Sequence, residues 1–183
     1  MSRRLHRVRN LWVDTRGVAA VEFAIVVPFM LLLYVGGVEL ANGLAISVKV
    51  SETAHTVADL VSRNACVTDS ALSTMIGASS VTIAPYSAGS TTVRVSEVST
   101  DANGKATVTW SKALNGAPRA AGQPMTLPPA LGTPSPANIS LILGEVTYSY
   151  TPNLGYTISG TVPISESYYL FPRVSSVVQY PCS

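Results

Sequence analysis

Charged side chains are scarce in this chain: only 12% of its 183 residues are Asp, Glu, Lys or Arg. Average globular domains contain about twice that share. Intrinsic disorder is excluded, because it requires low hydrophobicity and high net charge, whereas 47% of these residues are hydrophobic. The net charge is only +2, which disfavours a nucleic-acid-binding surface.

Residue types that bind metals or perform catalysis are also few. Histidine occurs only at His6 and His55, and cysteine only at Cys66 and Cys182. They lack the close spacing of a zinc site, which needs about three or four ligands. The sequence contains no nucleotide-binding loop and no G-x-S-x-G motif. It therefore predicts no metal, no cofactor and no enzyme, and His55 is expected to be a half-exposed helix residue.

The few charges are unevenly placed. Residues 1–16 contain five arginines and one aspartate, whereas anions outnumber cations in the rest of the chain. The 21 residues that follow Gly17, VAAVEFAIVVPFMLLLYVGGV, include one charged residue, Glu22. About 20 apolar residues span a bilayer as a helix, and flanking arginines stay in the cytoplasm. We expect a cytoplasmic leader at residues 1–17 and a transmembrane helix at residues 18–40.

Two other interpretations of this apolar segment fit less well. A core helix that is apolar on every face would need a larger domain around it than the remaining chain provides. A secretory signal peptide has a shorter apolar stretch, of about 7–15 residues, followed by a small-residue cleavage site. A retained anchor is the better prediction.

Glu22 is the unusual feature of the anchor, because an ionisable group inside a membrane is costly and is by default a candidate functional residue. Snorkelling of its carboxylate to the interface is the simpler alternative. Its surroundings favour function, since a glycine and four small apolar residues precede it and Phe23 follows it.

The segment RGVAAVEFAIVVPFMLLLYVGGVEL, residues 16–40, resembles the processing site of type IV pilins and pseudopilins. More narrowly, the chain resembles TadE-like pseudopilins of the tight-adherence (Flp, type IVb) pilus system. The tail is a second, weaker match, with VTYSYTP at 146–152 and ISESYYLFPR at 164–173.

The resemblance implies that a prepilin peptidase cuts between Gly17 and Val18. It also implies that Glu22 and Phe23 act in recognition and assembly. The new amine of Val18 would lie one helical turn from Glu22 and pair with it, in its own chain or in a neighbour. The implied partners are the peptidase, other pilins or pseudopilins and the inner-membrane assembly platform. The implied place is the bacterial inner membrane, with a single span and residues 41–183 exported.

The rest of the chain predicts an α+β fold: a long helix, half of it in the membrane, packed on a small antiparallel sheet. The helix should continue to about residue 65, because apolar residues recur at helical spacing at Ile46, Val50, Ala54, Val57 and Val61. Strands are expected at 81–84, 91–98, 106–110, 139–143, 146–150, 156–164 and 167–171, with a possible bulge at Gly144. Residues 112–138 contain six prolines and predict a long loop or an extended connection.

Cys66 and Cys182 are expected to form a disulfide if the domain is exported, because the compartment would be oxidising. Two free thiols are the alternative. Two rival functions also stay open: an uncleaved, membrane-anchored module that binds an envelope partner, and an envelope enzyme with a concave polar site.

Overall fold

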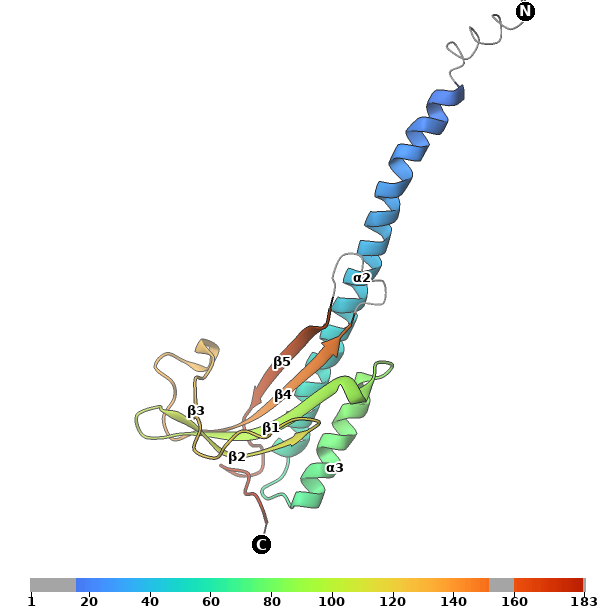
Figure 1. Ribbon diagram of the computed structural model, residues 1–183. Helices are drawn as coiled ribbons and strands as arrows, with labels where there is room; N and C mark the ends of the chain where they lie inside the picture. Colours follow the sequence, from blue (N-terminus) through green and yellow to red (C-terminus); the bar gives the residue numbers. More distant parts are fainter. Residues whose placement is uncertain (1–15, 152–159, 183) are drawn as a thin grey trace, which may run out of the picture. The chain divides into compact units, whose positions relative to one another are not determined.

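A computed structural model describes residues 16–151 and 160–182 (Figure 1). Residues 1–15, with most of the predicted leader, lie outside the described residues, as does the 156–159 part of one predicted strand. The chain forms two compact units, Met1–Asn42 and Gly43–Ser183. Helix α2, Arg16–Ser62, passes through both of them. It ends three residues before the predicted limit of 65.

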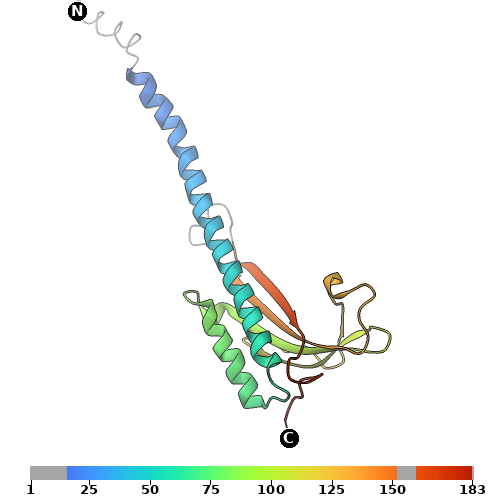
Figure 2. The ribbon, with the colours of Figure 1, turned by 180° about the vertical axis from the view of Figure 1, so that it is seen from behind.

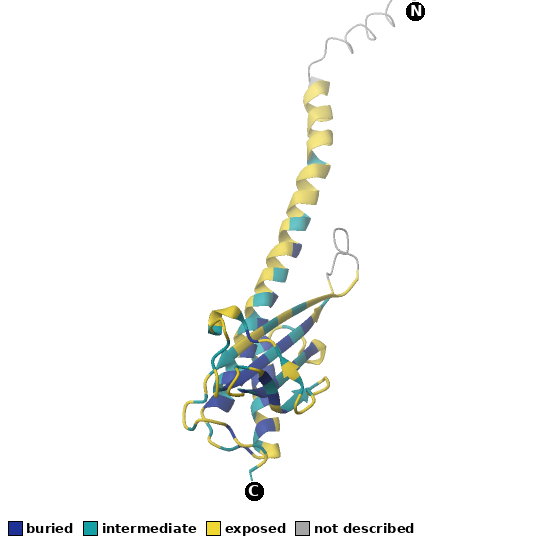
Figure 3. Ribbon diagram, turned by 90° about the vertical axis from the view of Figure 1, so that its left-hand side faces the viewer, coloured by how far each residue is buried: buried dark blue, intermediate teal, exposed yellow. Residues whose placement is uncertain are grey.

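In the first unit, the described residues form the N-terminal part of α2, which is coloured as exposed along most of its length (Figure 3). Phe23 is 71% exposed and Leu33 is 75% exposed. Within the described part of the chain, this is the one helix long and apolar enough to cross a membrane. The unit therefore has the properties expected of a membrane anchor.

The second unit contains a five-stranded sheet with the strand order β3-β2-β1-β4-β5. Every neighbouring pair is antiparallel. The strands are β1 Thr91–Thr100, β2 Ala106–Leu114, β3 Pro124–Met125, β4 Ser140–Tyr150 and β5 Val162–Leu170. With the long helix, this sheet confirms the predicted α+β class.

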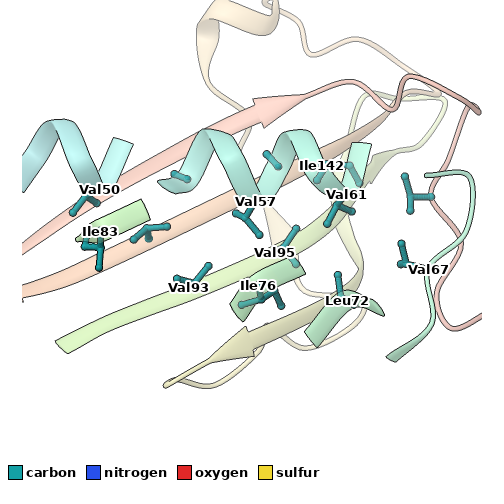
Figure 4. Close-up of a cluster of buried hydrophobic side chains, with 14 of the residues drawn as sticks. Val50, Val57, Val61, Val67, Leu72, Ile76, Ile83, Val93, Val95 and Ile142 are labelled. Carbon is teal, nitrogen blue, oxygen red and sulfur yellow. The ribbon is translucent and has the colours of Figure 1, made fainter. Parts of the chain in front are cut away.

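One face of the sheet is covered by residues 43–62 of α2 and by α3, Asp69–Ser80 (Figures 1 and 2). Figure 4 shows side chains of both helices meeting those of β1 and β4. The predicted apolar stripe of α2 is the centre of this core, and all its members are 0–1% exposed: Ile46, Val50, Ala54, Val57 and Val61.

The sequence analysis missed helix α3. Thr68 caps it, since its hydroxyl accepts a hydrogen bond from the Ala71 amide, and Asp69 stands in its first turn. Leu72 and Ile76 lie one turn apart and are buried. The strand predicted at 81–84 is wrong, because residues 81–83 form a 3₁₀ turn, η1, that follows α3 directly.

The opposite face of the sheet carries a smaller core that includes Val98, Leu127, Leu141 and Leu143. Leu127 comes from the proline-rich segment, which was predicted as a loop. That segment also contains β3 and a 3₁₀ turn, η3, Pro129–Leu131. A further 3₁₀ turn, η2 Ala88–Ser90, precedes β1.

Two predicted strand breaks are absent from the described sheet. Residues 140–150 form one strand, β4, through Gly144, and the register shift lies instead between Glu97 and Val98 where β1 meets β2. The described part of the last two predicted strands is also one strand, β5. An unbroken β4 lets all nine residues of β5 pair along it.

Candidate functional site

The predicted processing residues lie in the first two turns of α2. Helix α2 begins at Arg16, so Gly17, Val18, Glu22 and Phe23 are all helical. Val18 and Glu22 are four residues apart, which places them on the same side of the helix. Val18 is 55% exposed, and the Glu22 side chain is also exposed.

Gly17 has no structural reason to be glycine within the described fold. A Cβ atom built at position 17 would have nothing within 4 Å, and the backbone there has no left-handed φ. The same holds for Gly36 and Gly37 further along α2. Glycine weakens a helix by about 1 kcal/mol relative to alanine, and the described fold gives no steric reason for it at these positions.

Beyond the apolar segment, the C-terminal residues 171–182, which we call the strap, contact the end of α2. The predicted disulfide is present between Cys66 and Cys182. Backbone hydrogen bonds run beside it: the amide of Val67 donates to the carbonyl of Gln179 at 2.9 Å, and the amide of Gln179 donates to that of Ala65 at 3.0 Å. The strap therefore closes the domain at the α2–α3 turn.

The strap also crosses the end of the sheet. The indole N–H of Trp110 donates to the carbonyl of Val178 at 2.8 Å. In return, the amide of Val178 donates to Oε1 of Glu97 at 2.9 Å, and the hydroxyl of Ser140 donates to the same oxygen at 2.6 Å. Glu97 is 2% exposed. Sequence reasoning missed this role of Glu97, although its place among alternating valines of β1 marks it as facing the core.

Asp69 of α3 and Asp59 of α2 each contact a side chain of the strap. Asp69 accepts hydrogen bonds from Lys112 Nζ and from the Tyr180 hydroxyl, both at 2.6 Å. The bond from Lys112 lowers the pKa of Asp69, and the same bond raises the pKa of Lys112. Asp59 pairs with Arg63, as the spacing predicts, and with Arg173 of the strap at 2.7 Å.

A second ionic cluster lies on the opposite face of the sheet. Arg119 donates two hydrogen bonds to Glu145, at 2.9 and 2.5 Å, and Arg94 approaches the same carboxylate at 3.5 Å. Burial alone would raise the pKa of Glu145, but the hydrogen bonds and charges of the two arginines outweigh it and lower the pKa. Arg94 also donates to the carbonyl of Ala117 at 3.0 Å. The cluster therefore holds the segment after β2, which contains Ala117 and Arg119, against the sheet.

His55 is exposed rather than half-exposed, and its ring packs edge-on against Tyr168 of β5, with ring centres 4.6 Å apart. Both residues line a shallow surface depression of about 480 Å³ beside Glu52 and Thr82. Residues 16–151 and 160–182 contain no group of three or more His, Cys, Asp or Glu side chains that could hold a metal ion. The contact that the structure gives to the His55 ring is therefore its packing against Tyr168.

Comparison with known proteins gives a match that lies within helix α2. The family model described as TadE-like protein matches residues 17–59. No curated protein and no solved structure matches the chain. TadE-like proteins are structural components of the tight-adherence (Tad) pilus, and an apolar helix that could span a membrane agrees with such a component. The match confirms the predicted resemblance: this chain resembles TadE-like proteins over residues 17–59, the part of α2 that contains Gly17 and Glu22.

Proposed function

We propose that this protein is a minor pseudopilin of an Flp-type pilus. A prepilin peptidase cuts it after Gly17, and the chain that begins at Val18 stays in the bacterial inner membrane and takes part in pilus assembly. The proposal rests on two features that occur close together in the sequence: a glycine whose presence the fold does not explain, and an exposed glutamate. Gly17 and Glu22 serve no described contact of the fold, yet both lie in the segment that matches the TadE-like model.

The proposed cleavage suits the chemistry at Gly17. A peptidase must reach the carbonyl between Gly17 and Val18, and glycine leaves the backbone open because it has no Cβ. The five arginines of residues 1–16 hold the leader on the cytoplasmic side. The protease would then meet its bond at the membrane face.

The cut would also give Glu22 a partner. It releases a cationic amine on Val18, one helical turn from the Glu22 carboxylate. In a membrane this pair is strong, although desolvation of both charges opposes it. A buried charge pair sets register between packed helices better than it adds stability. Glu22 would therefore align the new subunit by pairing with its own or a neighbour's Val18 amine.

Small residues on α2 support packing against other membrane helices. Ala19, Ala20 and Ala24 follow the proposed cut, and Gly36 and Gly37 lie deeper in the apolar segment. Small side chains let membrane helices approach closely. Since nothing in the described chain fills the space beside these glycines, the proposed neighbours are the helices of other pilins.

The test is the mass and N-terminal sequence of the protein purified from membranes, with and without the prepilin peptidase. We expect a chain that starts at Val18 only when the peptidase is present. Gly17→Leu should block the cut, whereas Gly37→Leu should not, and at both positions an added Cβ would meet nothing within 4 Å. A chain that keeps its arginines in both membranes would overturn the proposal and leave an uncleaved anchor.

A further inference from the structure

Glu97 is the buried one among the described carboxylates of the second unit. Asp59, Asp69 and Glu145 each form an ion pair with at least one lysine or arginine. Glu97 is the most deeply buried of the four, yet within residues 16–151 and 160–182 it forms no ion pair. A buried carboxylate without a cation is costly, and the hydrogen bonds from Val178 and Ser140 are the described contacts that offset this cost.

Those two hydrogen bonds use the same oxygen. Both donors contact Oε1, and none of the described residues donates to Oε2. Glu97 lines a pocket of about 450 Å³ between the strap and the shifted register of β1 and β2. The carboxylate therefore has one acceptor oxygen left for a donor that enters this pocket.

The walls of the pocket suit an organic cation. The Trp110 and Tyr180 rings, 5.3 Å apart at their centres, both line it, with Pro181 beside them. Aromatic rings attract a cation that lies within about 6 Å of their faces. Ser99 and Thr109, whose hydroxyls are 3.0 Å apart, add oxygen acceptors. A hydrated metal ion fits poorly, because Glu97 is the only acidic side chain among the described residues that line the pocket.

We propose that this pocket binds a primary alkylammonium group, which completes the ion pair that Glu97 lacks. The ammonium donates to Oε2 of Glu97 and to the hydroxyl pair, and its alkyl chain lies against Trp110 and Tyr180. A lysine side chain of another polypeptide and a free polyamine share this chemistry. The site lies in the second unit and does not depend on processing at Gly17 or on the pilus role.

The experiment titrates the full-length chain, in neutral detergent micelles, with n-butylammonium. The background variant is Trp12→Phe, which leaves Trp110 as the only tryptophan. The readouts are the NMR shifts of the Trp110 indole N–H and of the Val178 amide. We expect a saturable shift of both signals, and at least tenfold weaker binding of n-butanol, which has the same chain without the charge.

Variants separate the charge from the fold. Glu97→Gln keeps an acceptor for Val178 and Ser140 but removes the charge, and should weaken binding at least tenfold. Glu52→Gln changes an exposed glutamate outside the pocket and should leave binding unchanged. If Glu97→Gln does not fold, Thr109→Leu is used, because Thr109 is exposed and its larger side chain obstructs the pocket.

Further arms identify the source of the ammonium. One ligand is a lysine that is blocked at both its α-amine and its carboxyl group, and the other is 1,4-diaminobutane. If the blocked lysine binds more tightly, the result supports a lysine of a partner polypeptide as the source. The reverse order supports a free polyamine. Absence of a saturable shift, equal binding of n-butanol, or unchanged binding in both pocket variants would overturn the proposal.

Discussion

The carbonyl oxygen of Ala54 lies directly over Gly144, so close that a Cβ atom at position 144 would be 2.3 Å from it. The same Cβ would be 3.0 Å from the Val57 side chain and 3.2 Å from that of Ala58. Glycine at the centre of β4 therefore sets how closely α2 approaches the sheet. Glycine has a weak propensity for strands, and the close contact with α2 explains why it stands here.

We predict that Gly144→Ala lowers the free energy of unfolding by about 1–3 kcal/mol, the usual range for an overpacked core. The added methyl meets helix backbone, which cannot rotate away as a side chain would. The matched control is Gly77→Ala in α3, where a Cβ meets nothing within 4 Å, and alanine there should be neutral or stabilising by up to about 1 kcal/mol. Urea unfolding of both variants measures the difference, and equal stabilities would contradict the prediction.

We predict that stability falls at acid pH, in part through Glu145. The pKa of Glu145 is lower in the folded chain than its ordinary value of 4.5. Its contribution is therefore complete above that value and is lost as the pH falls through the lower, folded-state pKa. Glu145→Gln should flatten this acid dependence. An unchanged slope of unfolding free energy against pH would show that the cluster does not contribute.

At neutral pH, Glu145→Gln should itself cost about 1–3 kcal/mol, because it removes charged hydrogen bonds and leaves Arg119 and Arg94 unpaired. The control is Glu52→Gln, which breaks an exposed pair with Lys49. Exposed pairs contribute about 0–1 kcal/mol. Denaturant unfolding at pH 7 compares the two variants, and equal losses would count against a special role of the cluster.

We predict that replacing Cys66 and Cys182 together by serine costs about 2–5 kcal/mol, the usual loss on removal of a native disulfide. The bridge joins residues 116 positions apart, so it restricts a long loop of the unfolded chain. The strap should then exchange its amide hydrogens faster, above all at Val178 and Gln179. Exchange rates equal to those of the parent chain would show that Glu97 and Trp110 hold the strap without the bridge.

We predict that Glu22→Gln leaves cleavage after Gly17 intact and reduces assembly into pili at least tenfold. The glutamine cannot pair with the cationic amine of Val18, whereas the scissile bond is untouched. Glu52→Gln is again the control, because it lies beyond the apolar segment. N-terminal sequencing reports cleavage, and the amount of sheared pili reports assembly. Normal pili with Glu22→Gln would remove Glu22 from the assembly step.

The sequence predicted the features that depend on periodicity and composition. The apolar stripe of α2 and the strands expected at 91–98 and 106–110 follow from local spacing, and local spacing is visible in a single chain. The predicted bridge of Cys66 and Cys182 is present because the strap returns to the end of α2. The roles of Gly17 and Glu22 stay predictions, because they concern partners outside this chain.

Helix α3 escaped prediction because its signal is weak. Only Leu72 and Ile76 form a strongly buried apolar pair, and serines and threonines fill much of the remaining helix. These residues have modest helix propensity, and tertiary contact with β1 and β2 decides their conformation. Glu97 escaped for a different reason: its partners, Val178 and Ser140, are far away in the sequence, so only the fold brings them together.

The Cys66–Cys182 bond also determines how this protein would carry mechanical load. All five strands lie between the two cysteines, so a covalent ring encloses the whole sheet. Tension applied between α2 and the C-terminus passes from residue 66 to residue 182 through the disulfide. The backbone between these two residues therefore does not carry the tension. The sheet, its ionic cluster and the pocket at Glu97 would remain unloaded while the helix is pulled.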